Sequence, residues 1–303
     1  MSDLHVHYLN RLPKHVATVE QEARHLPVVF QADIVVVGGG VAGVAAALGA
    51  AAEGRTVAIV EERNHFGYEL TGPHKGKTDP YRLQSEYSIA EDICQTLAES
   101  GDYKDGYVNP DVLMSDLHRR IANEGQIRPF LYTLGTGVLT EGGSVCGGVI
   151  LNRSGRQVIR APRVIDASED GRLAAAVGAP FVRSWTGEKT FRRFVRLWRD
   201  VDLTPGRLAV PAALGAVDDA VTVHQMGEKI YVEYAFTGQV GDRPAWDLSH
   251  FQAVSLDKAL DLVHYLEEAT GQAAVSPSTT TKAMDRYFVA QEIFVDEPPV
   301  VAC

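Results

Sequence analysis

The stretch ADIVVVGGGVAGVAAALGAAAEGRTVAIVEER, from Ala32 to Arg63, contains the strongest fold signal in the chain. A short β-branched run, Asp33 to Val37, leads into a glycine-rich turn, and an alanine-rich run from Gly40 to Glu53 follows. A second β-branched run, Thr56 to Val60, ends at a carboxylate. This order predicts a buried parallel strand, a helix and a second parallel strand, the βαβ unit of doubly wound sheets.

The glycines of this unit follow the spacing Gly38-x-Gly40-x-x-Gly43, in which each glycine has a role in binding a dinucleotide. Gly38 permits the tight turn, Gly40 lets the backbone approach a pyrophosphate, and Gly43 lets the helix lie close to the strand. The N–H groups of the first helical turn, which includes Val41 and Ala42, then face the phosphates with the positive end of the helix dipole. We therefore expect a dinucleotide site here.

Glu61 lies eighteen residues after Gly43, at the end of the second strand. A carboxylate there can accept hydrogen bonds from both ribose hydroxyls, and it would repel a 2′-phosphate, so the pattern disfavours NADP. Glu62 and Arg63 follow it and are further candidates for cofactor binding. The glycine pattern alone does not separate FAD from NAD.

Two further observations favour FAD. The glycine pattern opens the globular part of the chain, and the sequence after Arg63 is not a simple series of βα units. A second motif, RVIDASEDGRLAAAVGAPF from Arg163 to Phe181, completes another apolar strand and delivers the small residues Ala167 and Ser168 to its exit. Small residues at a sheet edge allow a ligand to approach the backbone closely.

These motifs resemble FAD-dependent oxidoreductases of the glutathione-reductase-type flavoprotein superfamily, and in particular a bacterial branch whose second motif reads roughly V-I-D-A-T-G-D-G-D-L-A. The resemblance covers residues 30 to about 185 and implies that the first segment binds the ADP half of FAD. In that branch the loop after the second strand, here HFGYELTGPHKG, runs along the pyrophosphate towards the flavin. The resemblance therefore adds Glu69, Leu70 and Val138 to the expected FAD contacts.

The chain departs from that family in two places. Glu169 stands where the family has glycine, and a carboxylate near a pyrophosphate is unfavourable unless it points away. The family also returns to the flavin with a glycine-containing segment, which the sequence TTTKAMDRYFVAQEIFVDEPPVVAC does not resemble. We therefore expect a second protein chain, identical or different, to supply the missing wall, with the apolar end VVAC docked on it.

The predicted fold class is α/β, with a Rossmann-like FAD-binding domain of parallel sheet, helices and β-meander, and a smaller mixed α+β substrate domain. The expected division is an N-terminal extension over 1–30, the FAD-binding domain over 31–185, and a substrate or partner domain with the C-terminal tail over 186–303. Helices are predicted from Asn109-Pro110 to Asn123 and from Ser255 to Thr270, and strands over 127–166 and 219–236. The segment TFRRFVRLWRD, residues 190–200, has apolar residues at helical spacing and predicts a helix with an arginine face.

Composition limits the class of protein. The net charge is −10 and 45% of the residues are hydrophobic, which argues against nucleic acid or an anionic membrane surface as the main partner. No apolar run is long enough for a transmembrane helix, so a cytoplasmic location is expected. Three cysteines, Cys94, Cys146 and Cys303, form no C-x-x-C pair, and no metal-ligand spacing is present.

His74 is the predicted proton-transfer residue, because its loop should run towards the flavin and imidazole titrates near neutral pH. Lys75, Tyr68 and His224 are the other candidates. The predicted function is hydride transfer between a small organic substrate and flavin, as a dehydrogenase or oxidase. The alternative is a flavin-fold subunit that is non-catalytic alone and completes its FAD site only with a partner. The intact glycine pattern favours the first, and Glu169 favours the second.

Overall fold

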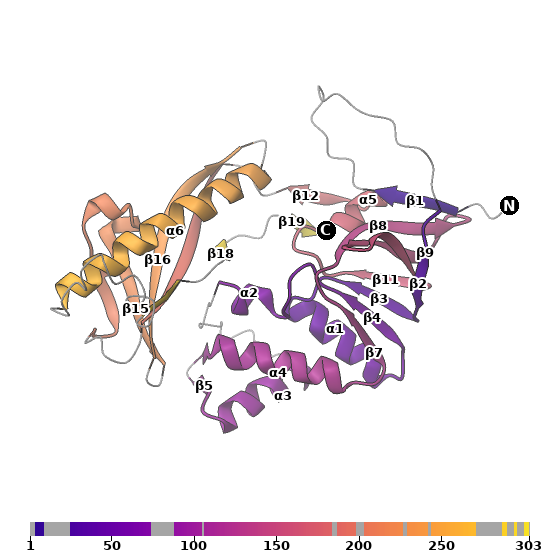
Figure 1. Ribbon diagram of the computed structural model, residues 1–303, viewed down its shortest axis with the longest axis horizontal. Coiled ribbons are helices and arrows are strands. Elements are labelled where there is room, and N and C mark those ends of the chain that lie inside the picture. The colour runs from indigo at the N-terminus through magenta and orange to yellow at the C-terminus, as the bar shows by residue number, and fades with distance from the viewer. Residues whose placement is uncertain are drawn as a thin grey trace.

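The computed structural model describes residues 4–8, 25–73, 88–104, 106–183, 187–197, 203–226, 229–241, 244–270, 287–289, 294–295 and 300–302. Figure 1 shows two groups of elements. One combines a parallel sheet with helices and a five-stranded sheet. The other is a largely antiparallel sheet crossed by a long helix, α6 (Pro244–Ala269). The predicted mixed α/β class, with parallel and antiparallel sheets, is confirmed.

Four parallel strands form the first sheet, in the order β11-β3-β4-β7. They are β3 (Ile34–Val37), β4 (Val57–Val60), β7 (Ile127–Phe130) and β11 (Arg163–Asp166). Every residue of β3 and β4 is buried, because both faces of these central strands are covered. Their sequences, IVVV and VAIV, supply an apolar side chain at each position, as a parallel strand covered on both faces requires.

Helices cover one face of this sheet (Figure 1). They are α1 (Val41–Ala52), α3 (Ser88–Glu99) and α4 (Pro110–Asn123), with the short α2 (Tyr68–Thr71) beside α4. The core on this side joins strand and helix residues, including Ile34, Val36, Val44, Ile59 and Leu117. The predicted helix that begins at Asn109-Pro110 is confirmed as α4. The low periodicity of residues 64–108 left open whether that stretch is functional or contains helices, and α2 and α3 form within it.

An antiparallel meander covers the opposite face, where Val35, Val37 and Val60 pack against Ile150 and Ile159. Its sheet has the order β1-β8-β9-β10-β2, and β2 runs parallel to β10. The strands are β1 (Leu4–Tyr8), β2 (Val28–Gln31), β8 (Leu134–Glu141), β9 (Ser144–Asn152) and β10 (Gly155–Arg160). The strands predicted within 127–166 are confirmed. The expected N-terminal extension contributes β1 and β2 to this sheet.

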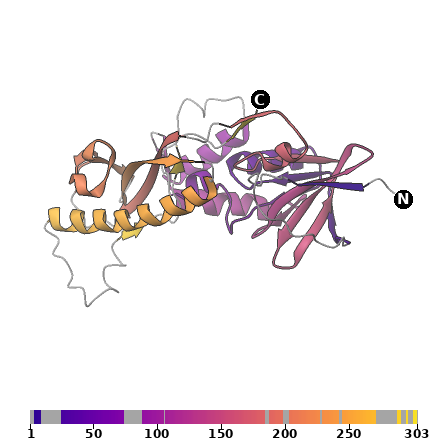
Figure 2. The same cartoon turned by 90° about the horizontal axis from the view of Figure 1, so that it is seen from above.

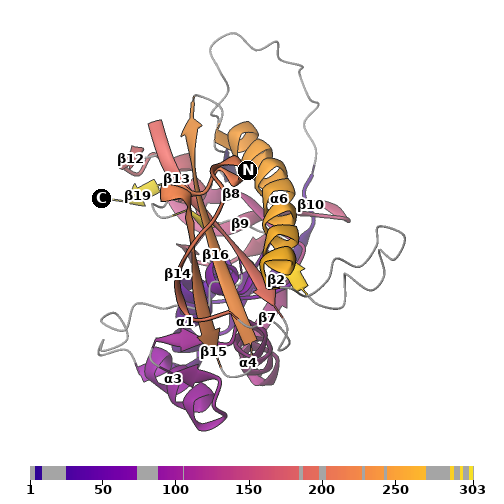
Figure 3. The same ribbon diagram turned by 90° about the vertical axis from the view of Figure 1, so that its left-hand side faces the viewer.

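The second group is a six-stranded sheet in the order β14-β15-β16-β13-β17, with β18 also paired to β13. Its strands are β13 (Gly187–Leu197), β14 (Gly206–Ala209), β15 (Ala220–Met226), β16 (Lys229–Val240), β17 (Tyr287–Val289) and β18 (Phe294–Val295). α6 lies along one face, as Figures 2 and 3 show, and buries Ala259, Leu262, Val263 and Leu266 against the strands. The predicted strand pair over 219–236 is confirmed, and α6 begins earlier than the predicted helix.

The prediction of a helix over residues 190–200 is wrong for residues 190–197, which form most of β13, and residues 198–200 lie outside the described part of the chain. Phe191, Val195 and Leu197 point to the core beneath α6, so the true apolar period is two residues. Arg193 occupies the remaining inward position and is buried. Because an arginine at a core position breaks the strand pattern, the apolar residues looked helical instead.

The end of the described chain returns to the molecule. β19 (Val300–Ala302) pairs antiparallel with β12 (Phe181–Arg183), which follows the short helix α5 (Arg172–Ala176). Residues 300–302, which we expected to dock on another chain, therefore pair within this one. The Glu297-Pro298-Pro299 stretch lies outside the described residues.

Candidate functional site

The turn between β3 and α1 is the centre of the site. Gly38 has φ 105°, in the region that favours glycine, and a Cβ there would collide with the carbonyl of Ala167. A Cβ on Gly43 would collide with the carbonyl of Gly38. The first and third glycines therefore allow β11 and α1 to approach the turn, and the small side chain of Ala167 belongs to the same close packing.

Glu61 is held inside this turn. Its Oε2 accepts a hydrogen bond from the N–H of Gly39 at 2.7 Å, and its Oε1 accepts one from the N–H of Arg63 at 2.7 Å. Burial raises the pKa of Glu61, and these two hydrogen bonds act in the opposite direction. Through these two hydrogen bonds the Glu61 carboxylate holds the glycine turn in place. Its remaining lone pairs are what a ribose could use.

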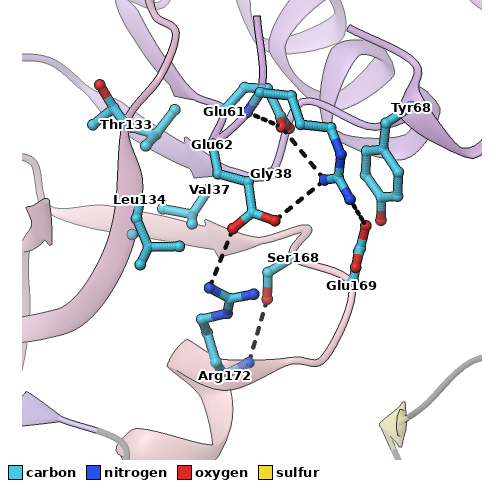
Figure 4. Close-up of a pocket in the computed structure, with 13 residues that line it drawn as sticks. Val37, Gly38, Glu61, Glu62, Tyr68, Thr133, Leu134, Ser168, Glu169 and Arg172 are labelled. Carbon is cyan, nitrogen blue, oxygen red and sulfur yellow. Dashed lines mark hydrogen bonds and ion pairs between the residues drawn. The ribbon is translucent and has the colours of Figure 1, made fainter. Parts of the chain in front are cut away.

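A recess of about 310 Å³, partly open to solvent, lies beside the turn. It is bounded by the ends of β3 and β4, the start of β8 and the loop after β11 (Figure 4). Its lining is Val37, Gly38, Val60, Glu61, Glu62, Arg63, Tyr68, Thr133, Leu134, Gly135, Ser168, Glu169 and Arg172. The motifs far apart in the sequence therefore meet at one place.

Ion pairs cross this recess. Arg63 contacts Glu169 at 2.7 Å and Glu62 at 3.2 Å, and Arg172 contacts Glu62 at 3.5 Å (Figure 4). The Arg63 guanidinium also lies 4.2 Å from the ring centre of Tyr68. Glu169, the departure from the family pattern, is thus paired with a cation. Sequence reasoning missed Arg172 and the contact between Arg63 and Glu169, although an acidic residue in this loop does require a nearby cation.

The second motif is built around Asp166. Its Oδ1 accepts hydrogen bonds from the N–H and hydroxyl of Ser168, and its Oδ2 accepts from the N–H groups of Leu173 and Ala174. The N–H of Ala167 donates to the carbonyl of Val37 at 2.8 Å. Asp166 therefore ties the exit of β11 to the start of α5, a role that the sequence reasoning did not assign.

Of the other predicted FAD contacts, some lie at the start of α1 and others lie in the core. Glu69 reaches the start of α1, where its Oε1 and Oε2 lie 3.1 and 2.9 Å from the N–H of Val41. Ala42 is exposed in the same turn, and Leu70 packs against the core on the helical side. Val138 is buried between two sheets, so it is absent from the recess lining. Thr133, Leu134 and Gly135 line the recess in its place.

Of the candidates for proton transfer, Tyr68 lines the recess. His74 and Lys75 fall outside the described residues. His224 lies on the face of the six-stranded sheet away from α6, with Nε2 2.9 Å from Oε2 of Glu233. Arg192 pairs with the other oxygen of Glu233. Burial acts to raise the pKa of Glu233, but the contacts with His224 and Arg192 bring it below its ordinary value.

The described part of the chain offers neither a metal site nor a membrane-spanning helix. No group of three or more His, Cys, Asp or Glu side chains there could hold a metal ion. None of its helices combines the length and apolarity that crossing a membrane needs. Cys94 and Cys146 are free thiols, and Cys303 lies outside the described residues.

Comparison with known proteins gives a family and a fold. A family model described as FAD dependent oxidoreductase matches residues 33–274, and no curated protein matches the chain. A geranylgeranyl bacteriochlorophyll reductase-like protein from Thermoplasma acidophilum is 17% identical, with TM-score 0.50 over 90% of this chain. The p-nitrophenol 4-monooxygenase PnpA from Pseudomonas putida is 14% identical, with TM-score 0.50 over 90%. BexE is 21% identical, with TM-score 0.47 over 67%.

These structural likenesses concern the fold. The chain spans 66% of the Thermoplasma protein, 67% of PnpA and 43% of BexE. The family match, by contrast, runs through both groups of elements, from the start of the parallel sheet to the end of α6.

Proposed function

Because the chain belongs to the FAD dependent oxidoreductase family, we propose that it binds FAD over the turn from Gly38 to Gly43 and transfers hydride between a small organic substrate and the flavin. The observation that carries the proposal is the convergence of the glycine turn, Glu61 and the second motif on one recess. FAD is the cofactor of this family, and it supplies the hydride acceptor or donor when bound.

The adenosine end of the recess fits such a cofactor. Glu61 is positioned to accept from ribose, and Arg63 and Ser168 lie around the same opening. Gly40 and the start of α1 would hold the pyrophosphate. The Glu69 carboxylate lies at this position, so the residues fit FAD once that side chain turns away.

We assign the chain to the glutathione-reductase-type branch on the strength of its second motif, VIDASEDGRLA. In this assignment residues 31–185 bind FAD and residues 186–303 form the substrate part. The polar face of the six-stranded sheet supports the assignment of residues 186–303 to the substrate part, because His224, Glu233 and Arg192 form one connected group there. In this proposal, a small substrate rests against that face of the sheet.

The cofactor itself provides the test. Acid release from the purified holoprotein, followed by mass measurement, should give one FAD per chain. Recovery of only NAD(H) or FMN in stoichiometric amount would contradict the proposal. A visible flavin spectrum of the same sample shows independently whether the flavin is bound.

Proton transfer is assigned to His74, with His224 as the candidate that the described geometry favours. Glu233 would orient the His224 imidazole through its contact with Nε2 at 2.9 Å. Replacing the active histidine should lower kcat about 100-fold or more and remove one limb of the pH profile, while FAD stays bound. His74→Ala and His224→Ala in the holoprotein distinguish the two. Full activity in both variants would exclude each of them.

The alternative function is a subunit that completes its FAD site only with a partner chain. The Glu69 carboxylate at the start of α1 favours it, because the cradle is filled from within the same chain. Native mass measurement decides between the two functions. A monomer that holds FAD and turns over substrate alone excludes the partner, whereas FAD bound only in a complex supports it.

A further inference from the structure

We propose that Glu69 is an internal occupant of the pyrophosphate site, so that FAD binds only after displacing this carboxylate from the start of α1. The inference rests on the proposed function, since it concerns the same site. Glu69 would then oppose cofactor binding, whereas the other residues of the site favour it.

The first observation is the hydrogen bonding of Glu69. Both carboxylate oxygens lie within hydrogen-bond distance of the N–H of Val41, at 3.1 and 2.9 Å. α1 has twelve residues, no acidic residue in its first turn and no side-chain hydrogen bond from its N-cap, Gly40. Helix starts favour a negative charge and an oxygen acceptor. Glu69 supplies both from a separate element, α2, twenty-eight residues further along the chain.

The second observation is the position of the carboxylate over Gly40. A Cβ on Gly40 would collide with the Glu69 carboxylate, so this group fills the space that the missing side chain leaves open. That space is where the glycine pattern lets a phosphate approach the backbone. A phosphate oxygen and the carboxylate cannot both occupy it, and both need the same N–H of Val41.

The charges around Glu69 make the contact reversible. Burial raises the pKa of Glu69, and the hydrogen bond from Val41 lowers it. The Glu61 carboxylate raises the same pKa, whereas Arg63 lowers it. The ionised side chain is therefore held by good hydrogen bonds but has lost water and lies near a like charge. A ligand that replaces the carboxylate would also release it to solvent.

The backbone of α2 should stay in place during this exchange. The N–H of Gly67 donates to the carbonyl of Gly39 at 2.8 Å, and the Thr71 hydroxyl donates to the carbonyls of Phe66 and Gly67. The start of α2 is also packed closely against Leu117. We therefore assign the displacement to rotation of the Glu69 side chain, with α2 remaining attached to the glycine turn.

The test is an FAD titration of the cofactor-free chain, followed by flavin fluorescence. Glu69→Gln removes the charge and Glu69→Ala removes the occupant, while Glu53→Gln, at an exposed carboxylate on the other end of α1, is the control. Both Glu69 variants should bind FAD about 10- to 100-fold more tightly than the wild type, with Glu69→Ala at least equal to Glu69→Gln. Inorganic pyrophosphate should raise the Tm of Glu69→Ala more than that of the wild type.

The outcomes separate the two proposals. Unchanged FAD affinity in both Glu69 variants, with a wild type that binds FAD, overturns this inference and leaves the proposed function standing. Weaker binding in folded Glu69 variants makes Glu69 a direct ligand and also overturns it. Absence of FAD binding in every folded variant overturns the proposed function together with the inference. Thermal unfolding of each cofactor-free variant establishes that it is folded.

Discussion

Glu61, Glu69 and Asp166 all direct their carboxylates at backbone N–H groups, the first two around the turn between β3 and α1 and the third at the start of α5. Each satisfies donors that a bend or a helix start leaves without an internal partner. The polar residues of the site therefore have two kinds of role. Glu61 holds the glycine turn, Asp166 holds the connection from β11 to α5, and Glu69 lies where an anionic ligand would bind.

Gly38→Ala should destabilise the protein strongly. Its φ of 105° is unfavourable for alanine, and the new Cβ would meet the carbonyl of Ala167. We expect a loss of more than about 3 kcal/mol in the free energy of unfolding. Gly54→Ala is the matched control, because it has φ 73° but open space around it, and should cost only about 1–2 kcal/mol. Equal effects in urea unfolding would show that β11 does not approach the turn this closely.

The stability of the cofactor-free protein should depend on pH through Glu69. Its pKa is raised, mainly by burial, so the folded protein binds more protons than the unfolded chain between the ordinary value of 4.5 and the raised value. Stability contributed by Glu69 is thus present at low pH and is lost as the pH rises through the raised pKa. Glu61 has a pKa raised in the same direction, so a comparison with Glu69→Gln is needed to isolate Glu69.

Urea unfolding of the wild type and Glu69→Gln from about pH 8 to about pH 5 measures this contribution. The wild type should gain stability relative to the variant as the pH falls. A difference that is constant across this range would mean that Glu69 does not titrate with a raised pKa in the folded protein.

At the residue scale the sequence predicted the turn better than its surroundings. Glycine spacing has a direct steric meaning, so Gly38, Gly43 and Glu61 could be placed from local pattern alone. The pairing of Arg63 with Glu169 joins residues 106 positions apart, and no local pattern reports it. Val138 does not line the recess, because β8 borders it with its first residues, Leu134 and Gly135.

Secondary-structure elements followed the sequence wherever one face is buried and the pattern is complete. β3, β4, α1 and α4 meet this condition, and each forms at the predicted place. β13 does not, because Arg193 stands at an inward position between Phe191 and Val195. Its guanidinium donates to the Ser255 hydroxyl at 3.0 Å and to Gln252 of α6, partners that no strand pattern could indicate.

Arg193→Ala should therefore weaken the attachment of α6 to the sheet. The change removes hydrogen bonds to Ser255 and Gln252 and leaves buried polar atoms and space behind. We expect a loss of about 2–4 kcal/mol in the free energy of unfolding. Arg207→Ala, at an exposed ion pair with Asp218, should cost less than about 1 kcal/mol. If the two variants unfold at the same urea concentration, Arg193 is not buried in the folded protein.

At the scale of the whole molecule, the two groups of elements meet through contacts that the sequence did not suggest. Arg196 of β13 pairs with Asp111 at the start of α4, and β12 carries the chain from the first group towards the second (Figure 1). The arrangement brings the polar face of the six-stranded sheet to the side of α4. Sequence pattern reports local burial, so it could predict some elements of each group but not how the two groups pack.

The central claim is that the glycine turn holds FAD, and calorimetric titration of the cofactor-free chain with FAD tests it most directly. The wild type should bind one FAD per chain, because the space over Gly40 can take the pyrophosphate once the Glu69 carboxylate turns away. Gly40→Val should abolish binding, since its side chain would fill that space, while circular dichroism shows that the variant is folded. Wild-type affinity for FAD in folded Gly40→Val would contradict the account.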